Sequence, residues 1–305
     1  MTSSASAKTP PLQALQGIRI LSLALNLPGP AALMRCRQMG ATCIKLEPPS
    51  GDPMGLYNKP AYAQLHEGVK VQTADLKTEA GQKALHRELE KADVLLTSFR
   101  PSAIEKLGLG WKKIHTLYPA LSHVAIVGAP GARAEEPGHD LTYLADNGLV
   151  PGLELPATLY ADMSGSLMAS EAVLQAALQR QEPYAGTGDP HPRGAFIEVA
   201  LSDAAAYLAL PRQWGLTQPS GSVGGAHAGY RVYPCQDGRV AVAALEPHFA
   251  AALCAAAGVE AADIRAMFAT ATHEAIAAFM RTQTRAQLDQ LAAAKDIPLH
   301  TLLNS

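Results

Sequence analysis

Short apolar runs alternate with helix-like patterns through the first half of the chain. The apolar runs, which predict β-strands, stand at 18–23, 42–46, 93–97 and 122–127. Segments with helical patterning separate them, at 31–39, 79–91 and 102–107, the first of these after a turn at 26–30. A strand–helix–strand order is typical of parallel βαβ units, so the pattern predicts a parallel sheet covered by helices.

The second half of the chain follows a different pattern. Helices are predicted at 140–148, 162–181 and 201–210, and a further strand at 195–199. Residues 230–244 alternate around the turn Gln236-Asp237-Gly238, which is typical of a β-hairpin. An Ala-rich helical tail begins near Pro247.

These patterns predict an α/β protein of two domains. The large one is Rossmann-like, with a parallel sheet and a central helix, and the smaller one is α+β. The expected boundaries are a disordered head at 1–14, the large domain at 15–185, a linker at 186–220 and the small domain at 221–305.

Composition narrows the class of protein. Hydrophobic residues make up 48% of the 305 residues, enough for a packed core. The net charge of −2 argues against a nucleic-acid partner. The sequence has no apolar run of about 18 residues and no signal-like start, so we expect a cytoplasmic protein without a membrane partner. The four cysteines form no C-x-x-C pair, and no metal site is predicted.

The first βαβ unit invites a dinucleotide-binding interpretation. Glu47 follows the second strand, where a ribose-binding acid would stand. However, the first turn reads LALNLPGP and lacks the G-x-G-x-x-G fingerprint. Its prolines also remove backbone N–H donors that a pyrophosphate needs, so this interpretation is disfavoured.

Three ionisable residues are candidates for chemistry. Asp162 begins the longest predicted helix, where it would act as an N-cap or, held ionised by the helix dipole, as a base or nucleophile. His139 precedes a predicted helix that Asp140 is expected to cap, which leaves the imidazole free for proton transfer. Glu246 follows a strand and is either a site residue or simply exposed.

Several segments together resemble the family III CoA-transferases, also called the CaiB/BaiF family. The segments stand in the family's order, and the resemblance covers roughly residues 15–249. They are 15–53, 74–82, 92–110, 138–150, the Asp162 helix and 230–249. The resemblance implies an acyl-CoA enzyme, with coenzyme A as part of the substrate and no permanently bound cofactor. It also implies an interlocked homodimer.

Two motifs are similar to the α-methylacyl-CoA racemase branch of that family. They are Gly138-His139-Asp140 and Glu246-Pro247-His248-Phe249. The resemblance implies that His139 and Asp162 act as the two bases on opposite faces of the α-carbon, with Glu246 on the histidine side. The expected activity is racemisation or epimerisation of a 2-methylacyl-CoA. We also expect backbone N–H groups from Met163 onward to stabilise the developing oxyanion.

The resemblance further implies a CoA site on the large domain, with cationic residues for the phosphates. Its candidate residues are Thr73, Ala74, Leu76, Lys77, Arg100 and Lys106.

Two other functions stay open. In a CoA-transferase, Asp162 would be the nucleophile that moves CoA between carboxylic acids. A non-catalytic paralogue, or a subunit of a hetero-oligomer, is suggested by departures from the family pattern. Pro48 replaces a usual arginine, residues 66–70 differ from the usual N-R-x-K stretch, only 23 positions separate His139 from Asp162, and members usually continue beyond the position of Ser305.

Overall fold

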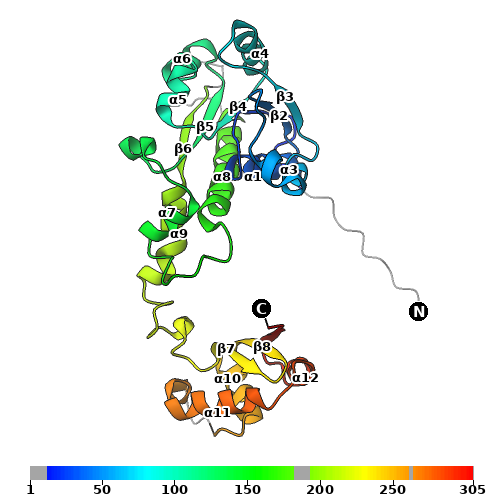
Figure 1. Ribbon diagram of the computed structural model, residues 1–305, viewed down its shortest axis with the longest axis vertical. Coiled ribbons are helices and arrows are strands. Elements are labelled where there is room, and N and C mark those ends of the chain that lie inside the picture. Colours follow the sequence, from blue (N-terminus) through cyan, green and yellow to red (C-terminus); the bar gives the residue numbers. More distant parts are fainter. Residues whose placement is uncertain (1–11, 182–192, 261–263, 305) are drawn as a thin grey trace, which may run out of the picture. The chain divides into compact units, whose positions relative to one another are not determined.

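The computed structural model describes residues 12–181, 193–260 and 264–304 (Figure 1). The chain divides into two compact units, with the boundary between Ala209 and Leu210. Most of the expected disordered head, and the Pro/Gly-rich stretch before Arg193, lie outside the described residues. Within the described ranges, no helix combines the length and apolar character needed to cross a membrane.

The first unit contains a six-stranded sheet in which every pairing is parallel. Its order, β3-β2-β1-β4-β5-β6, is that of a doubly wound Rossmann-type sheet, as the apolar pattern predicts. The strands are β1 (Arg19–Ser22), β2 (Thr42–Glu47), β3 (Lys70–Thr73), β4 (Val94–Thr97), β5 (Ser122–Val127) and β6 (Phe196–Ala200).

Helices cover both faces of this sheet (Figure 1). One apolar core joins the sheet to α1 and α8, and a second joins its other face to α4, α5 and α6. The helices are α1 (Pro28–Gln38), α2 (Met54–Tyr57), α3 (Lys59–Leu65), α4 (Glu79–Leu89), α5 (Pro101–Lys106), α6 (Trp111–Leu117), α7 (Asp140–Asp146), α8 (Tyr160–Gln181) and α9 (Leu201–Gln213). The last of these contains the boundary between the units.

Helix α1 begins earlier than the sequence predicts. The prolines at 28 and 30 belong to its first turn rather than to a turn before it. A proline is tolerated there because the first N–H groups of a helix have no partner within it. The chain turns into the helix at Asn26, whose φ of 65° is left-handed. Gly29 is required, since a Cβ there would lie 2.1 Å from that of Ala24.

The expected linker 186–220 contains regular structure. Strand β6 pairs with β5 over five positions and completes the large sheet, and α9 follows it directly. The sequence pattern does predict this strand and helix, but not that they belong to the large sheet and its unit. One reason is that the Pro/Gly-rich stretch before them suggests a domain boundary. The other is that their pairing partner, β5, lies far back in the sequence.

The second unit is a three-stranded antiparallel sheet with a helical layer. Strands β7 (Tyr230–Cys235) and β8 (Gly238–Ala243) form the predicted hairpin, and β9 (Leu299–Leu302) pairs with β8 on its other side. The unit's apolar core joins the sheet to α10 (Pro247–Ala256), α11 (Thr270–Arg281) and α12 (Arg285–Lys295). This is the expected α+β unit, and the α/β fold class is confirmed.

Candidate active site

A cavity of about 920 Å³ opens at the carboxyl ends of the parallel strands. Its wall is built from the segments that follow β1, β4 and β5, together with α7 and the start of α8. Strand order reverses between β1 and β4, and such a switch point is where open α/β sheets bind ligands. His139, Asp162 and Arg100 all line this cavity.

Asp162 is the third residue of α8 rather than its N-cap. The helix begins at Tyr160, and the first backbone bond runs from Met163 N–H to the carbonyl of Leu159. The N-cap interpretation is therefore wrong. Burial, and secondarily the charge of Asp140, raises the pKa of the Asp162 carboxyl to about 6, while His139 acts in the opposite direction. A carboxyl with this pKa can hold or release a proton near neutral pH.

Asp140 plays a different part from the one that the sequence suggests. His139, in extended conformation, is the N-cap of α7, and Asp140 is the first helical residue. The Asp140 side chain is buried and accepts a hydrogen bond from the backbone N–H of Asp162 at 3.0 Å. It therefore ties the start of α7 to the start of α8 and places the His139 and Asp162 segments side by side.

His139 is exposed on the wall of the cavity. Its backbone N–H donates to Thr142 Oγ1 at 3.0 Å, and that hydroxyl donates to the His139 carbonyl at 2.7 Å. These bonds fix the backbone of a residue that lines the cavity. The expectation that Asp140 caps the helix is wrong. His139 and Asp162 line the same cavity, and their roles as the two bases stay a prediction.

The backbone N–H of Met163 is not a free oxyanion donor, because it bonds within the helix. The N–H of Asp162 is likewise used, by Asp140. The first N–H groups of an α-helix have no acceptor within the helix. In α8 these include the N–H groups of Tyr160 and Ala161.

Glu246 lies in the second unit, where it is the N-cap of α10. Its backbone is extended, and Pro247 occupies the first helical position, which suits a helix start. The cavity of the first unit is lined by first-unit residues. A role for Glu246 on the histidine side of the site stays a prediction.

Four predicted CoA residues follow or end β3. Thr73 and Lys77 are exposed, Ala74 is buried and Leu76 is partly buried. The side-chain amide of Gln82 donates to the Leu76 carbonyl at 2.6 Å and to the carbonyl of Leu107, the C-cap of α5, at 3.3 Å. This bond pair joins the two segments in which the CoA residues are predicted.

Arg100 and Lys106 bracket helix α5, and both are exposed. Glu135, which stands in no motif of the sequence, binds the start of this helix through Ser102, accepting from its N–H at 2.6 Å and its hydroxyl at 2.8 Å. These hydrogen bonds, then the nearby charges of Arg100 and Lys106, lower the pKa of Glu135. An anionic group at this helix would therefore share its cations with a resident carboxylate.

A second group of ionisable side chains lies at the end of β2 and is buried. The ammonium of Lys45, with no exposed surface, contacts Asp52 and lies 3.1 Å from Glu47 Oε1 and 2.8 Å from His66 Nε2. Tyr62 donates its hydroxyl to Glu47 at 2.9 Å. The Glu47 carboxylate is thus occupied by partners within the protein.

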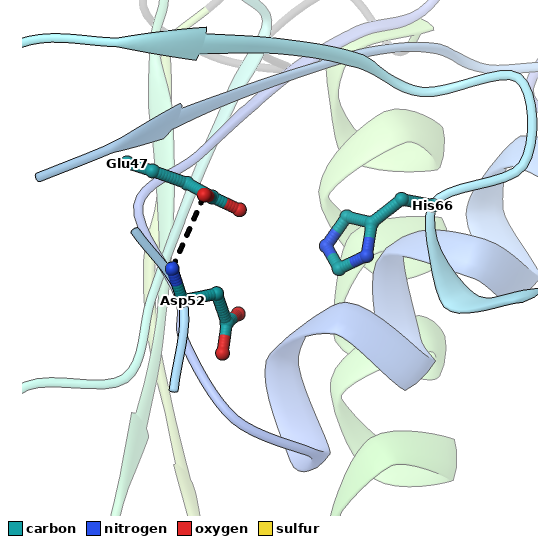
Figure 2. A group of neighbouring side chains, drawn as sticks. All are labelled: Glu47, Asp52 and His66. Carbon is teal, nitrogen blue, oxygen red and sulfur yellow. Dashed lines mark hydrogen bonds between the residues drawn. The ribbon is translucent and has the colours of Figure 1, made fainter. Parts of the chain in front are cut away.

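Figure 2 shows the side chains of Glu47, Asp52 and His66 gathered around one space. One possible ligand atom from each residue lies within 4.8 Å of the others. That spacing would suit a metal ion, but the ammonium of Lys45 contacts all three side chains and supplies the cation instead. Asp52 also accepts the backbone N–H of Asn26 at 3.1 Å. The cluster therefore holds the turn after β1, which forms part of the cavity wall.

The sequence profile of CoA-transferase family III matches residues 15–305. The chain is 31% identical over 221 residues to a protein of Mycobacterium tuberculosis named probable fatty acyl-CoA transferase Rv3272, covering 65% of this chain and 53% of that one. It is 28% identical over 254 residues to the human alpha-methylacyl-CoA racemase, covering 77% of this chain and 63% of that one. The chain thus spans less than two thirds of either relative.

Solved structures have the same fold. The crystal structure of Rv3272 aligns with a TM-score of 0.79 at 24% identity, covering 95% of this chain and 85% of that one. A CAIB/BAIF family protein from Brucella suis aligns with a TM-score of 0.76 at 23% identity, covering 95% and 84%. At this identity the likeness concerns the fold alone.

Proposed function

Since the chain belongs to CoA-transferase family III, we propose that it acts on acyl-CoA thioesters and exchanges the α-proton of a 2-methylacyl-CoA, racemising or epimerising it. The observation that supports this proposal is that His139 and Asp162 line one cavity, tied together through Asp140. A histidine serves a proton-transfer reaction directly, whereas a carboxylate alone would suffice for CoA transfer.

The proposed reaction has two steps. One base takes the proton from the α-carbon, and the C–H electron pair forms the enolate double bond while the carbonyl electrons move to the thioester oxygen. The other base returns a proton to the opposite face, and the carbonyl re-forms. The raised pKa of Asp162, about 6, suits this exchange because the same carboxyl must be able to accept and to donate a proton near neutral pH.

A CoA-transferase is the second candidate. Asp162 would then attack the thioester carbonyl and form a mixed anhydride, while the C–S bond breaks and CoA leaves as a thiolate. The thiolate would next attack the Asp162 carbonyl, which releases the first carboxylate and leaves an Asp162–CoA thioester for the acceptor acid. One relative of the chain favours this candidate. A succinyl-CoA–D-citramalate CoA-transferase of Chloroflexus aurantiacus is 35% identical to this chain over 131 residues, which cover 40% of this chain and 32% of that one. As part of the proposed acyl-CoA function, we also propose that the protein is a cytoplasmic homodimer. The residues proposed to contact CoA are Thr73, Ala74, Leu76, Lys77, Arg100 and Lys106.

The deciding measurement is deuterium incorporation into 2-methylbutanoyl-CoA in D2O, followed by mass spectrometry. We expect incorporation by the wild type, and losses of at least about 10³-fold in Asp162→Ala and His139→Ala. Asp203→Ala is the matched control, because Asp203 is also the third residue of a helix but is exposed and outside the cavity. Its rate should equal that of the wild type.

Other outcomes separate the alternatives. Full exchange in His139→Ala would refute the two-base reaction. No exchange, combined with modification of Asp162 by hydroxylamine during turnover with an acceptor acid, would assign CoA transfer. Neither exchange nor trapping, across several acyl groups, would indicate a non-catalytic paralogue or a subunit of a larger assembly.

A further inference from the structure

Tyr143 stands in the cavity wall, and two glycines make room for its ring. A Cβ at Gly128, after β5, would lie 2.3 Å from the phenol oxygen, and one at Gly138, before α7, would lie 2.6 Å from it. Both glycines line the cavity, and only 8% of Tyr143 is exposed. The hydroxyl is therefore held between two backbone segments at the edge of the cavity.

The hydroxyl of Tyr143 has no hydrogen-bond partner in the described part of the chain. By contrast, the hydroxyls of Tyr62, Tyr118 and Tyr233 bond to Glu47, His86 and a backbone carbonyl. The Tyr143 oxygen is not among the fully enclosed atoms without a partner, so it is open to the cavity. Because tyrosine hydroxyls in protein interiors usually have a partner, an unpaired one that opens to a cavity suggests a partner that arrives with the ligand.

The surroundings keep this hydroxyl protonated. Burial and then the charge of Asp162 raise the pKa of Tyr143, while Arg100 acts in the opposite direction. A neutral phenol is a hydrogen-bond donor, and the negatively charged Asp162 lies close enough to affect it. The group that would need such a donor beside Asp162 is an oxygen on which negative charge develops.

We propose that Tyr143 is a further catalytic residue, whose hydroxyl donates a hydrogen bond to the thioester carbonyl oxygen of the acyl-CoA. This inference rests on the proposed acyl-CoA function of the same cavity. When the α-proton leaves, the carbonyl oxygen gains the charge of an enolate, and the Tyr143 hydroxyl keeps its own proton while its hydrogen bond strengthens. It supplies the donor that the Met163 N–H, bonded within α8, does not provide.

Tyr143→Phe tests the proposal cleanly, because phenylalanine keeps the ring between the two glycines and removes only the hydroxyl. We expect the rate of deuterium incorporation into 2-methylbutanoyl-CoA to fall roughly 10²-fold, with the loss in kcat rather than KM. The melting temperature should stay that of the wild type. Tyr118→Phe is the control, since this hydroxyl bonds to His86 outside the cavity, and its exchange rate should be unchanged.

A spectroscopic readout separates this role from a structural one. In the slow Asp162→Asn background, the infrared stretch of a ¹³C-labelled thioester carbonyl of bound 2-methylbutanoyl-CoA should lie below its solution value. Adding Tyr143→Phe should move it back up. An unchanged stretch, or an unchanged exchange rate, would overturn the assignment to Tyr143. If the wild type binds the thioester without exchanging it, the proposed reaction fails and the stretch still decides on Tyr143; absence of binding overturns both.

Discussion

The carboxylates of Glu47 and Asp52 lie buried beside Lys45, whereas that of Asp162 lies partly buried beside a second acid, Asp140. In the first group the ammonium contacts both carboxylates, and hydrogen bonds from a tyrosine and from backbone N–H groups complete the set. In the second group no lysine or arginine of the described residues forms an ion pair with Asp162, and burial, then the charge of Asp140, raises its pKa to about 6.

The difference teaches how one domain uses ionisable groups in two ways. Charges that are fully paired within the protein hold the backbone, here the turn after β1, and are not available for chemistry. Burial of a carboxyl without a paired cation lowers the stability of the fold and raises the pKa of that carboxyl toward neutral pH. Both groups lie at the carboxyl ends of the same sheet, so position alone does not distinguish a structural cluster from a reactive one.

The largest expected effect comes from removing the central cation of the buried cluster. Lys45→Met keeps most of the volume but leaves Glu47 and Asp52 without their counter-charge. We expect the free energy of unfolding to fall by about 3–5 kcal/mol, measured by urea denaturation at pH 7.5. The control is Lys83→Met, which removes an exposed i,i+4 pair with Glu79 and should cost no more than about 0.5 kcal/mol. Equal stabilities for the two variants would contradict a structural role for the cluster.

Replacing Asp162 is expected to raise the free energy of unfolding rather than lower it. Its folded-state pKa is raised to about 6 from an ordinary 3.8, so it stabilises the fold most below pH 3.8 and loses that contribution as pH rises through 6. Asp162→Asn should therefore be more stable than the wild type by about 1–2 kcal/mol at pH 8, while losing activity. Urea denaturation at pH 8 and pH 4 checks this, since the advantage should shrink toward zero at the lower pH. A destabilised variant at pH 8 would show that the carboxylate is compensated after all.

Much of the large sheet is predictable from the sequence because its strands are buried on both faces. Strands β4 and β5 are buried along their whole length, and three of the four residues of β4 and the last four of β5 are apolar. Strand β3 is not predictable in this way, because it lies at the sheet edge, is mostly exposed and offers only Val71 as an apolar residue. Strand β9 is missed for the same reason, being short and only partly buried.

The candidate site is predictable only in part. His139 and Asp162 emerge from the motifs that resemble the family, and both line the cavity. The bond between Asp140 and the Asp162 backbone spans 22 positions and depends on how α7 packs against α8, which no local pattern encodes. The clearance that Gly128 and Gly138 give to Tyr143 depends equally on packing. Local patterns thus indicate which residues are reactive, and tertiary contacts determine how their charges are tuned.

The smallest and most specific effect is expected at Asp140. Its charge is the second cause, after burial, of the raised pKa of Asp162. Asp140→Asn keeps an oxygen that can accept the Asp162 N–H but removes that charge, so the pKa of Asp162 should fall. Where the Asp162 carboxylate limits the reaction, the acid limb of the pH profile for deuterium incorporation should move to lower pH. The control is Asp146→Asn, at the exposed end of the same helix α7, which should leave the limb in place. A limb that moves equally in both variants would assign the effect to the net charge of the helix, and one that moves in neither would show that burial alone sets this pKa.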